Sequence, residues 1–121
     1  MTTATLPPNC PACRGALSVE KLRCKQCGTS VEGAFPVPRL GRLNREEQQF
    51  LELFVLSSGS LKTVAKKMSI SYPTVRKLLD RLMEHLAEEI ACDEAERQEI
   101  LRAAESGSIS LDEAKEKLKK I

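Results

Sequence analysis

Four of the five cysteines in this 121-residue chain stand in two pairs near the N-terminus, and they constrain the fold more than any other feature. The pairs read Cys10-Pro-Ala-Cys13 and Cys24-Lys-Gln-Cys27, with ten residues between them. Two residues between cysteines let both sulfurs face one side of a tight turn, and four thiolates form a closed, tetrahedral structural zinc site. We therefore predict a small zinc ribbon in which these four cysteines bind one structural Zn²⁺ ion.

Disulfides and a redox-active pair are the alternative roles for these cysteines. Disulfides fit poorly with a cytoplasmic protein. A redox CxxC pair normally lies where a strand meets a helix in a larger α/β domain, which this segment lacks. A four-sulfur site leaves no open coordination position for catalysis, so the predicted zinc ion is structural.

The remainder of this first module, residues 1–42, is predicted from short alternating segments. Residues 16–19 and 21–23 suggest a short hairpin between the cysteine pairs, and residues 29–35 suggest a further strand. Pro36 and Pro38 then indicate an extended connector, since alternate prolines suit neither a helix nor a central strand. Arg39 and Arg42 make it basic, and we favour a solvated linker over an arm that touches nucleic acid.

Residues 61–78 carry the pattern of a helix-turn-helix. Apolar side chains recur at inward positions on both sides of a short turn, and the small Ala65 stands where two steeply crossing helices approach most closely. Ser69 occupies the turn position that glycine usually takes. A first helix is predicted from Asn44, whose capping box uses Glu47, to about Ser57.

The third helix is expected to continue as an apolar stripe from Val75 to Ile90, widened by Leu78 and Met83. This stripe is either a seam for a homodimer or a face covered by the chain's own C-terminus. His85 on this segment is expected to be a surface or packing residue and not a metal ligand, and Cys92 is expected to be inert. The helix-turn-helix domain is therefore assigned to residues 43–91.

The C-terminal residues 92–121 are predicted to form a helical hairpin. One helix covers residues 96–105, with Ile100 and Leu101 facing inward. The other begins at a second capping box on Ser110 and places Ala114 and Leu118 on one face. The predicted fold class is thus a small zinc-ribbon β module, then an all-α helix-turn-helix domain, then a C-terminal helical hairpin.

The charge distribution favours contact with duplex DNA. The formal net charge is only +2, but five basic side chains between residues 61 and 79 face no acidic neighbour before Asp80. Residues of the second helix suit phosphates, and those at the start of the third helix would reach the major groove. The predicted DNA-binding residues are Lys62, Lys66, Lys67, Ser71, Tyr72, Thr74, Arg76 and Lys77.

Several function classes are excluded or disfavoured by what the chain contains. It has no apolar run long enough to span a bilayer and no signal-peptide pattern at its start, so we expect a cytoplasmic protein. It has one histidine and no phosphate loop or nucleophile–base arrangement, so we do not expect an enzyme. A DNA-binding transcriptional regulator is the first hypothesis. The alternative is a non-enzymatic adaptor that docks onto the transcription or translation machinery.

The order CPAC, CKQC, FPVPRLGRL, FLELF and ISYPTVRKLLDRL resembles a small bacterial family defined as a domain of unknown function, described as zinc ribbon plus helix-turn-helix. The resemblance covers about residues 10–90. The tail ESGSISLDEAKEKL is similar to a short helical-hairpin module found in assorted bacterial proteins. Membership implies the two-part architecture and a regulatory role, and it assigns functional residues only at Cys10, Cys13, Cys24 and Cys27.

Overall fold

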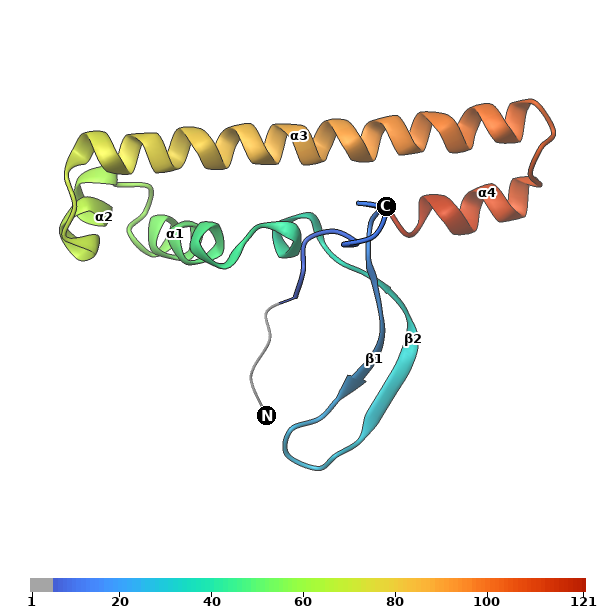
Figure 1. Ribbon diagram of the computed structural model, residues 1–121, viewed down its shortest axis with the longest axis horizontal. Coiled ribbons are helices and arrows are strands. Elements are labelled where there is room, and N and C mark those ends of the chain that lie inside the picture. Colours follow the sequence, from blue (N-terminus) through green and yellow to red (C-terminus); the bar gives the residue numbers. More distant parts are fainter. Residues whose placement is uncertain (1–5) are drawn as a thin grey trace. The chain divides into compact units, whose positions relative to one another are not determined.

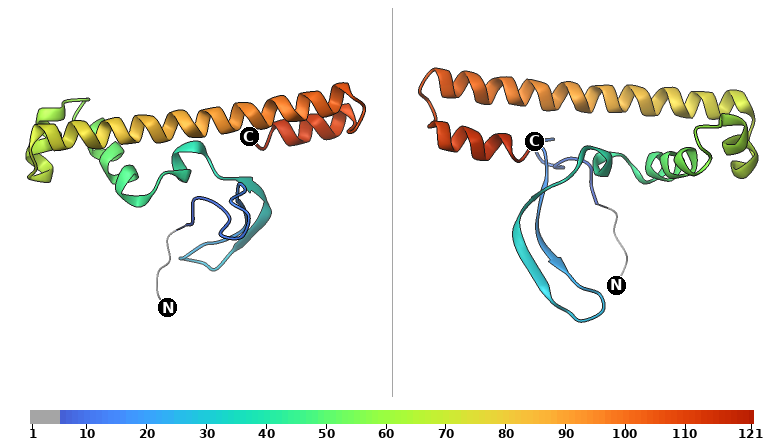
Figure 2. Two further views of the ribbon diagram at one scale, coloured as in Figure 1. Left: turned by 45° about the horizontal axis from the view of Figure 1, so that its top comes forward. Right: turned by 180° about the vertical axis from the view of Figure 1, so that it is seen from behind.

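The structure, a computed structural model, describes residues 6–121, so the first five residues of the predicted ribbon module lie outside it. The described residues contain two strands, one 3₁₀ helix and four α-helices (Figures 1 and 2). They divide into two compact units. The first, the helical unit, contains Arg39–Glu89, and the second contains Asn9–Pro38 together with Ile90–Ile121.

The ribbon is one antiparallel hairpin of β1 (Ser18–Arg23) and β2 (Ser30–Pro36). Val19 pairs with Phe35 and Leu22 with Val31, and an irregularity falls between Val19 and Lys21. The predicted strand over residues 29–35 is confirmed. The predicted hairpin within residues 16–23 is wrong, because a single residue is too short to reverse a chain and the alternation continues across the irregularity as one strand.

The first helix of the helical unit, α1 (Arg45–Leu56), has the predicted capping box. The Glu47 N–H donates to Asn44 Oδ1 at 2.9 Å, and the Asn44 N–H donates to Glu47 Oε2 at 3.1 Å. The helix ends where Gly59 takes a φ of 78° and its N–H donates to the Phe54 carbonyl at 2.9 Å. Both ends of α1 therefore follow from local sequence signals.

The helix-turn-helix is formed by α2 (Leu61–Met68) and α3 (Tyr72–Glu105). Val64 and Ala65 on α2 are buried, as the packing of two crossing helices requires. Ser69 ends α2 in the left-handed conformation, with φ 56° and ψ 40°. The turn that glycine usually makes is thus made here by serine.

Replacing Ser69 with glycine is expected to stabilise the helical unit. A residue with a Cβ atom in this conformation is disfavoured by about 1 kcal/mol, and part of that gain is offset by the greater freedom of glycine in the unfolded chain. We expect Ser69→Gly to raise the free energy of unfolding by about 0.5–1 kcal/mol in urea denaturation. Ser69→Ala keeps the Cβ atom and is the matched control. An equal gain in both variants would contradict this account.

The apolar stripe of α3 is buried in the core of the helical unit. Val75 and Leu82 are buried together with Phe50 of α1 and Val64 of α2, and Leu78, Leu79 and Leu86 pack against this cluster. Neither predicted use of the stripe describes this arrangement, because α1 and α2 of the same chain cover it. Met83 and Ile90 stay exposed, at 56% and 49%. A homodimer remains an untested prediction, and the buried positions of the stripe offer no seam for it.

The helix α3 is continuous over 34 residues, so the predicted break before residue 96 is wrong. Residues 91–95 contain neither glycine nor proline, and nothing in them ends a helix. The predicted domain boundary after residue 91 therefore lies within a helix. The division of the chain into domains stays a prediction.

The C-terminal turn brings α4 (Leu111–Leu118) back beside the end of α3, as Figures 1 and 2 show. Ser110 caps α4 by accepting the Glu113 N–H at 3.1 Å. Ile100 and Ala114 are buried, as predicted. Leu101 was predicted to face inward, but it is exposed, because it lies one residue past Ile100 and so on the flank of the helix.

The end of the connector is held against the helical unit. Arg42 closes the 3₁₀ helix η1 (Arg39–Arg42) and pairs with Glu89 at 3.1 Å, and their side chains are 14% and 13% exposed. Gln48 also donates to the Leu43 carbonyl at 3.0 Å. Arg42 is therefore neither part of a solvated linker nor available to nucleic acid. His85 makes a polar contact within the helical unit, with Nδ1 2.8 Å from Glu47 Oε2.

Candidate zinc centre and nucleic-acid interface

The first cysteine pair lies in a tight knuckle. The Arg14 N–H donates to the Cys10 carbonyl at 2.8 Å, and the Cys10 N–H donates to the Gly15 carbonyl at 2.9 Å. The Gly15 N–H points at the sulfur of Cys13, 3.4 Å away. A backbone amide directed at a cysteine sulfur stabilises the thiolate that a metal ion would bind.

The second pair repeats this geometry. The Gly28 N–H donates to the Cys24 carbonyl at 3.0 Å, and the Cys24 N–H donates to the Thr29 carbonyl at 2.8 Å. Gly28 has a φ of 76°, and the equivalent Arg14 has a φ of 61°. The two knuckles thus share a left-handed residue directly after the second cysteine, which the glycine at position 28 signals and the arginine at position 14 does not.

Local hydrogen bonds favour the thiolate form in both knuckles. Backbone amides of Cys13 and Ala12 lower the pKa of the Cys10 thiol. The hydroxyl of Thr29, 3.0 Å from the sulfur, is the main cause that lowers the pKa of Cys27 to about 7. Thr29 is a supporting residue that the cysteine spacing did not reveal. All four thiols are free, as metal ligands must be.

The structure places the two pairs apart. Across residues 6–121, no three His, Cys, Asp or Glu side chains form a group that could hold a metal ion. The reason lies in β1, since a six-residue strand between the pairs advances the chain by about 20 Å. The donor chemistry and each separate knuckle fit zinc, while the meeting of four sulfurs requires the segment between the pairs to bend.

The eight predicted DNA-binding residues are all exposed on α2 and the start of α3 or in the turn between them. At the start of α3, Tyr72, Thr74, Arg76 and Lys77 are exposed, while Val75 between them is buried. Lys66 and Lys67 lie in the last turn of α2, where cations suit the helix dipole. The basic side chains of the predicted set, Lys62, Lys66, Lys67, Arg76 and Lys77, are thus all exposed within the helical unit.

Three of these residues also have partners within the chain. The hydroxyls of Ser71 and Thr74 are 2.8 Å apart and cap the start of α3. Arg76 forms an exposed ion pair with Asp80 at 3.4 Å. Such exposed pairs contribute about 0–1 kcal/mol, so a phosphate or a base edge can replace the carboxylate. Tyr72 and Lys77 are exposed without a hydrogen bond or ion pair of the side chain among the described residues.

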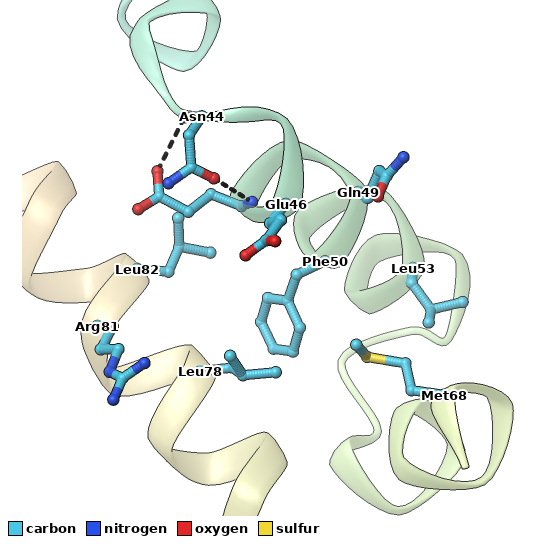
Figure 3. A pocket seen from close by; sticks show the side chains of 10 residues that line it. Asn44, Glu46, Gln49, Phe50, Leu53, Met68, Leu78, Arg81 and Leu82 are labelled. Carbon is cyan, nitrogen blue, oxygen red and sulfur yellow. Dashed lines mark hydrogen bonds between the residues drawn. The ribbon is translucent and has the colours of Figure 1, made fainter. Parts of the chain in front are cut away.

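A pocket of about 410 Å³ is a further feature, and no sequence pattern predicted it. It lies in the helical unit between α1, the end of α2 and α3 (Figure 3). Sequence periodicity identifies which face of each helix is apolar, but it does not show where three such faces leave space. The pocket lining shares no residue with the predicted DNA surface.

Comparison with known families gives two matches. Residues 10–40 match the family model described as the DUF2089 zinc ribbon, and residues 43–89 match the one described as domain of unknown function (DUF2089)-HTH. Searches of curated proteins and of solved structures found no match. The ribbon match implies zinc binding, and a ribbon joined to a helix-turn-helix suggests a nucleic-acid-binding regulator. No helix within residues 6–121 is long and apolar enough to span a membrane.

Proposed function

The chain belongs to the DUF2089 family, in which a zinc ribbon precedes a helix-turn-helix domain, and we propose that it is a cytoplasmic, non-enzymatic transcriptional regulator that binds duplex DNA. The observation that carries this proposal is the exposure of the basic side chains on α2 and in the first turns of α3. A helix presented in this way fits the major groove of B-DNA, which is wide enough to admit one α-helix.

The roles of the residues follow from their positions on the two helices. Lys62, Lys66 and Lys67 on α2 contact backbone phosphates, which orient the protein without reading sequence. Arg76 projects from the second turn of α3 and contacts a base edge, guanine being the base that a bidentate guanidinium prefers. Ser71, Tyr72, Thr74 and Lys77 complete the contact surface.

The ribbon serves as a zinc-stabilised module in this proposal. Cys10, Cys13, Cys24 and Cys27 hold one Zn²⁺ ion, and the ion replaces the apolar core that so short a segment lacks. The chain between the pairs bends from its extended strand to bring the four sulfurs together. Zinc has no catalytic task here, since four protein ligands leave no position for a substrate.

Removal of two charges tests the DNA contact. We expect Arg76→Ala combined with Lys77→Ala to weaken binding to a selected genomic fragment by about 100-fold, because a bidentate base contact is worth about 1–3 kcal/mol and each phosphate contact adds to the total. An electrophoretic mobility assay across a range of salt concentrations measures both the affinity and the number of phosphate contacts. The dependence of log affinity on log salt should become shallower by about 1–2 units.

A matched control combines one residue of α3 with one of α4. Arg97 is also paired with an acidic neighbour, Glu94, at 3.2 Å, and Lys115 on α4 is exposed. Arg97→Ala combined with Lys115→Ala removes the same net charge outside the predicted surface, and its affinity should stay within about twofold of the parent protein. Equal loss in both double variants would overturn the site. Absence of binding to any genomic fragment, with a stoichiometric protein partner that survives nuclease treatment, would favour the adaptor.

A further inference from the structure

The pocket in the helical unit has an apolar floor. Phe50 and Leu53 come from α1, Met68 from the end of α2, and Leu78 and Leu82 from α3 (Figure 3). Its volume of about 410 Å³ lies within the range of small-molecule sites, about 300–1,000 Å³. An apolar floor of this kind takes up an aliphatic or aromatic group and releases water from it.

One wall of the pocket is joined by hydrogen bonds within the chain. The backbone amide and side chain of Asn44 are joined to Glu47 by the reciprocal capping bonds. Glu47 is also held by His85, whose Nδ1 lies 2.8 Å from Glu47 Oε2. Asn44 and Glu47 are therefore already bonded within the chain. They hold the start of α1 in place and offer no free charge to a ligand.

Two opposite charges on the pocket lining remain uncommitted. Glu46 belongs to α1 and Arg81 to α3, so they stand on different walls (Figure 3). Within residues 6–121, neither side chain makes a hydrogen bond or an ion pair, and they do not pair with each other. A cavity that is apolar inside and carries one free cation and one free anion is complementary to a molecule with the reverse arrangement of charges.

We propose that this pocket binds a small zwitterion with an apolar body, such as a free apolar α-amino acid. Its carboxylate pairs with the Arg81 guanidinium, whose planar fork suits two carboxylate oxygens. Its ammonium group donates to the Glu46 carboxylate, and its side chain packs on Phe50 and Leu78. The site is separate from the proposed DNA contacts because the two surfaces share no residue, so either can fail without the other.

Titration of the full, zinc-loaded, ¹⁵N-labelled chain followed by NMR tests the proposal. The probes are L-phenylalanine, L-leucine and the longer zwitterion Leu-Phe, with 3-phenylpropionate and 2-phenylethylamine as analogues that lack the ammonium and the carboxylate respectively. A zwitterion should shift amide signals in residues 44–53 and 78–82, and each analogue should bind about tenfold or more weakly. Whether the amino acids or the dipeptide bind more tightly identifies the length of the ligand.

Two variants and two controls complete the experiment. Glu46→Gln and Arg81→Gln should each weaken binding about tenfold or more, because each removes one charge-assisted hydrogen bond. Glu52→Gln and Arg45→Gln change exposed residues of the same helical unit outside the lining and should leave the affinity unchanged. Circular dichroism confirms that all four variants are folded. The proposal would be overturned if no probe shifted any signal at millimolar concentration. It would also be overturned if 3-phenylpropionate and 2-phenylethylamine bound as tightly as the zwitterions, or if all four variants had the same affinity.

Discussion

Removal of zinc is expected to unfold the ribbon and to leave the helical unit folded. Within residues 9–38, no residue is buried, so the hairpin has no apolar core of its own. Binding of structural zinc in small finger peptides is worth about 10–16 kcal/mol, which exceeds what a two-stranded hairpin supplies. Addition of a strong chelator should collapse the dispersed NMR signals of residues 10–38 while those of α1 and α2 persist.

Serine substitutions distinguish the proposed zinc ligands from the fifth cysteine, Cys92. Cys24→Ser removes one proposed ligand and should reduce the zinc content of the purified protein and unfold the ribbon. Cys92 is exposed on α3 and is the matched control, since Cys92→Ser should retain the metal and the spectrum of the parent. Metal analysis of the parent should give one zinc ion per chain. A chelator that removes all metal without a spectral change would show that zinc does not support this fold.

Truncation of Phe50 to alanine is expected to destabilise the helical unit strongly. The ring is 4% exposed, belongs to the buried cluster with Val64 and Val75, and stacks on Phe54 with ring centroids 6.3 Å apart. Phe→Ala changes at such sites cost about 3–5 kcal/mol, through lost apolar burial and the cavity left behind. Domains of this size have stabilities of only about 5–15 kcal/mol, so much of the margin is lost.

Urea denaturation followed by circular dichroism at 222 nm measures this loss. Leu56→Ala is the matched control because Leu56 lies on the same helix and is 77% exposed. Its free energy of unfolding should stay within about 0.5 kcal/mol of the parent. Similar losses in the two variants would contradict the assignment of Phe50 to the core and of Leu56 to the surface.

Local signals in the sequence predicted the helical unit well. The capping box at Asn44 placed the start of α1, and the apolar spacing around Ala65 placed α2 and the turn. These features depend on residues within a few positions of one another, so the sequence reveals them directly. The ribbon was predicted less well, because whether residues 16–23 form two short strands or one long one depends on which distant segment pairs with them.

The apolar stripe of α3 shows the same contrast between local signals, which the sequence reveals, and distant contacts, which it does not. Its periodicity from Val75 to Leu86 predicted a covered face, and that face is covered. The sequence did not identify the cover, because an apolar face packs equally well on α1, on the C-terminal hairpin or on a second chain. The length of α3 was also misjudged, since a predicted boundary had no helix-ending residue to support it.

By itself, the sequence determined the cysteine pairs, the family, the helix-turn-helix and the exposed basic residues of α2 and α3, because each rests on residue type and short spacing. Only the tertiary structure decided that Arg42 is held by Glu89, that α1 and α2 cover α3, and that Glu46 and Arg81 line one pocket. These contacts join residues that are about 35–50 positions apart or lie on different helices. They depend on how helices cross, which no local pattern encodes.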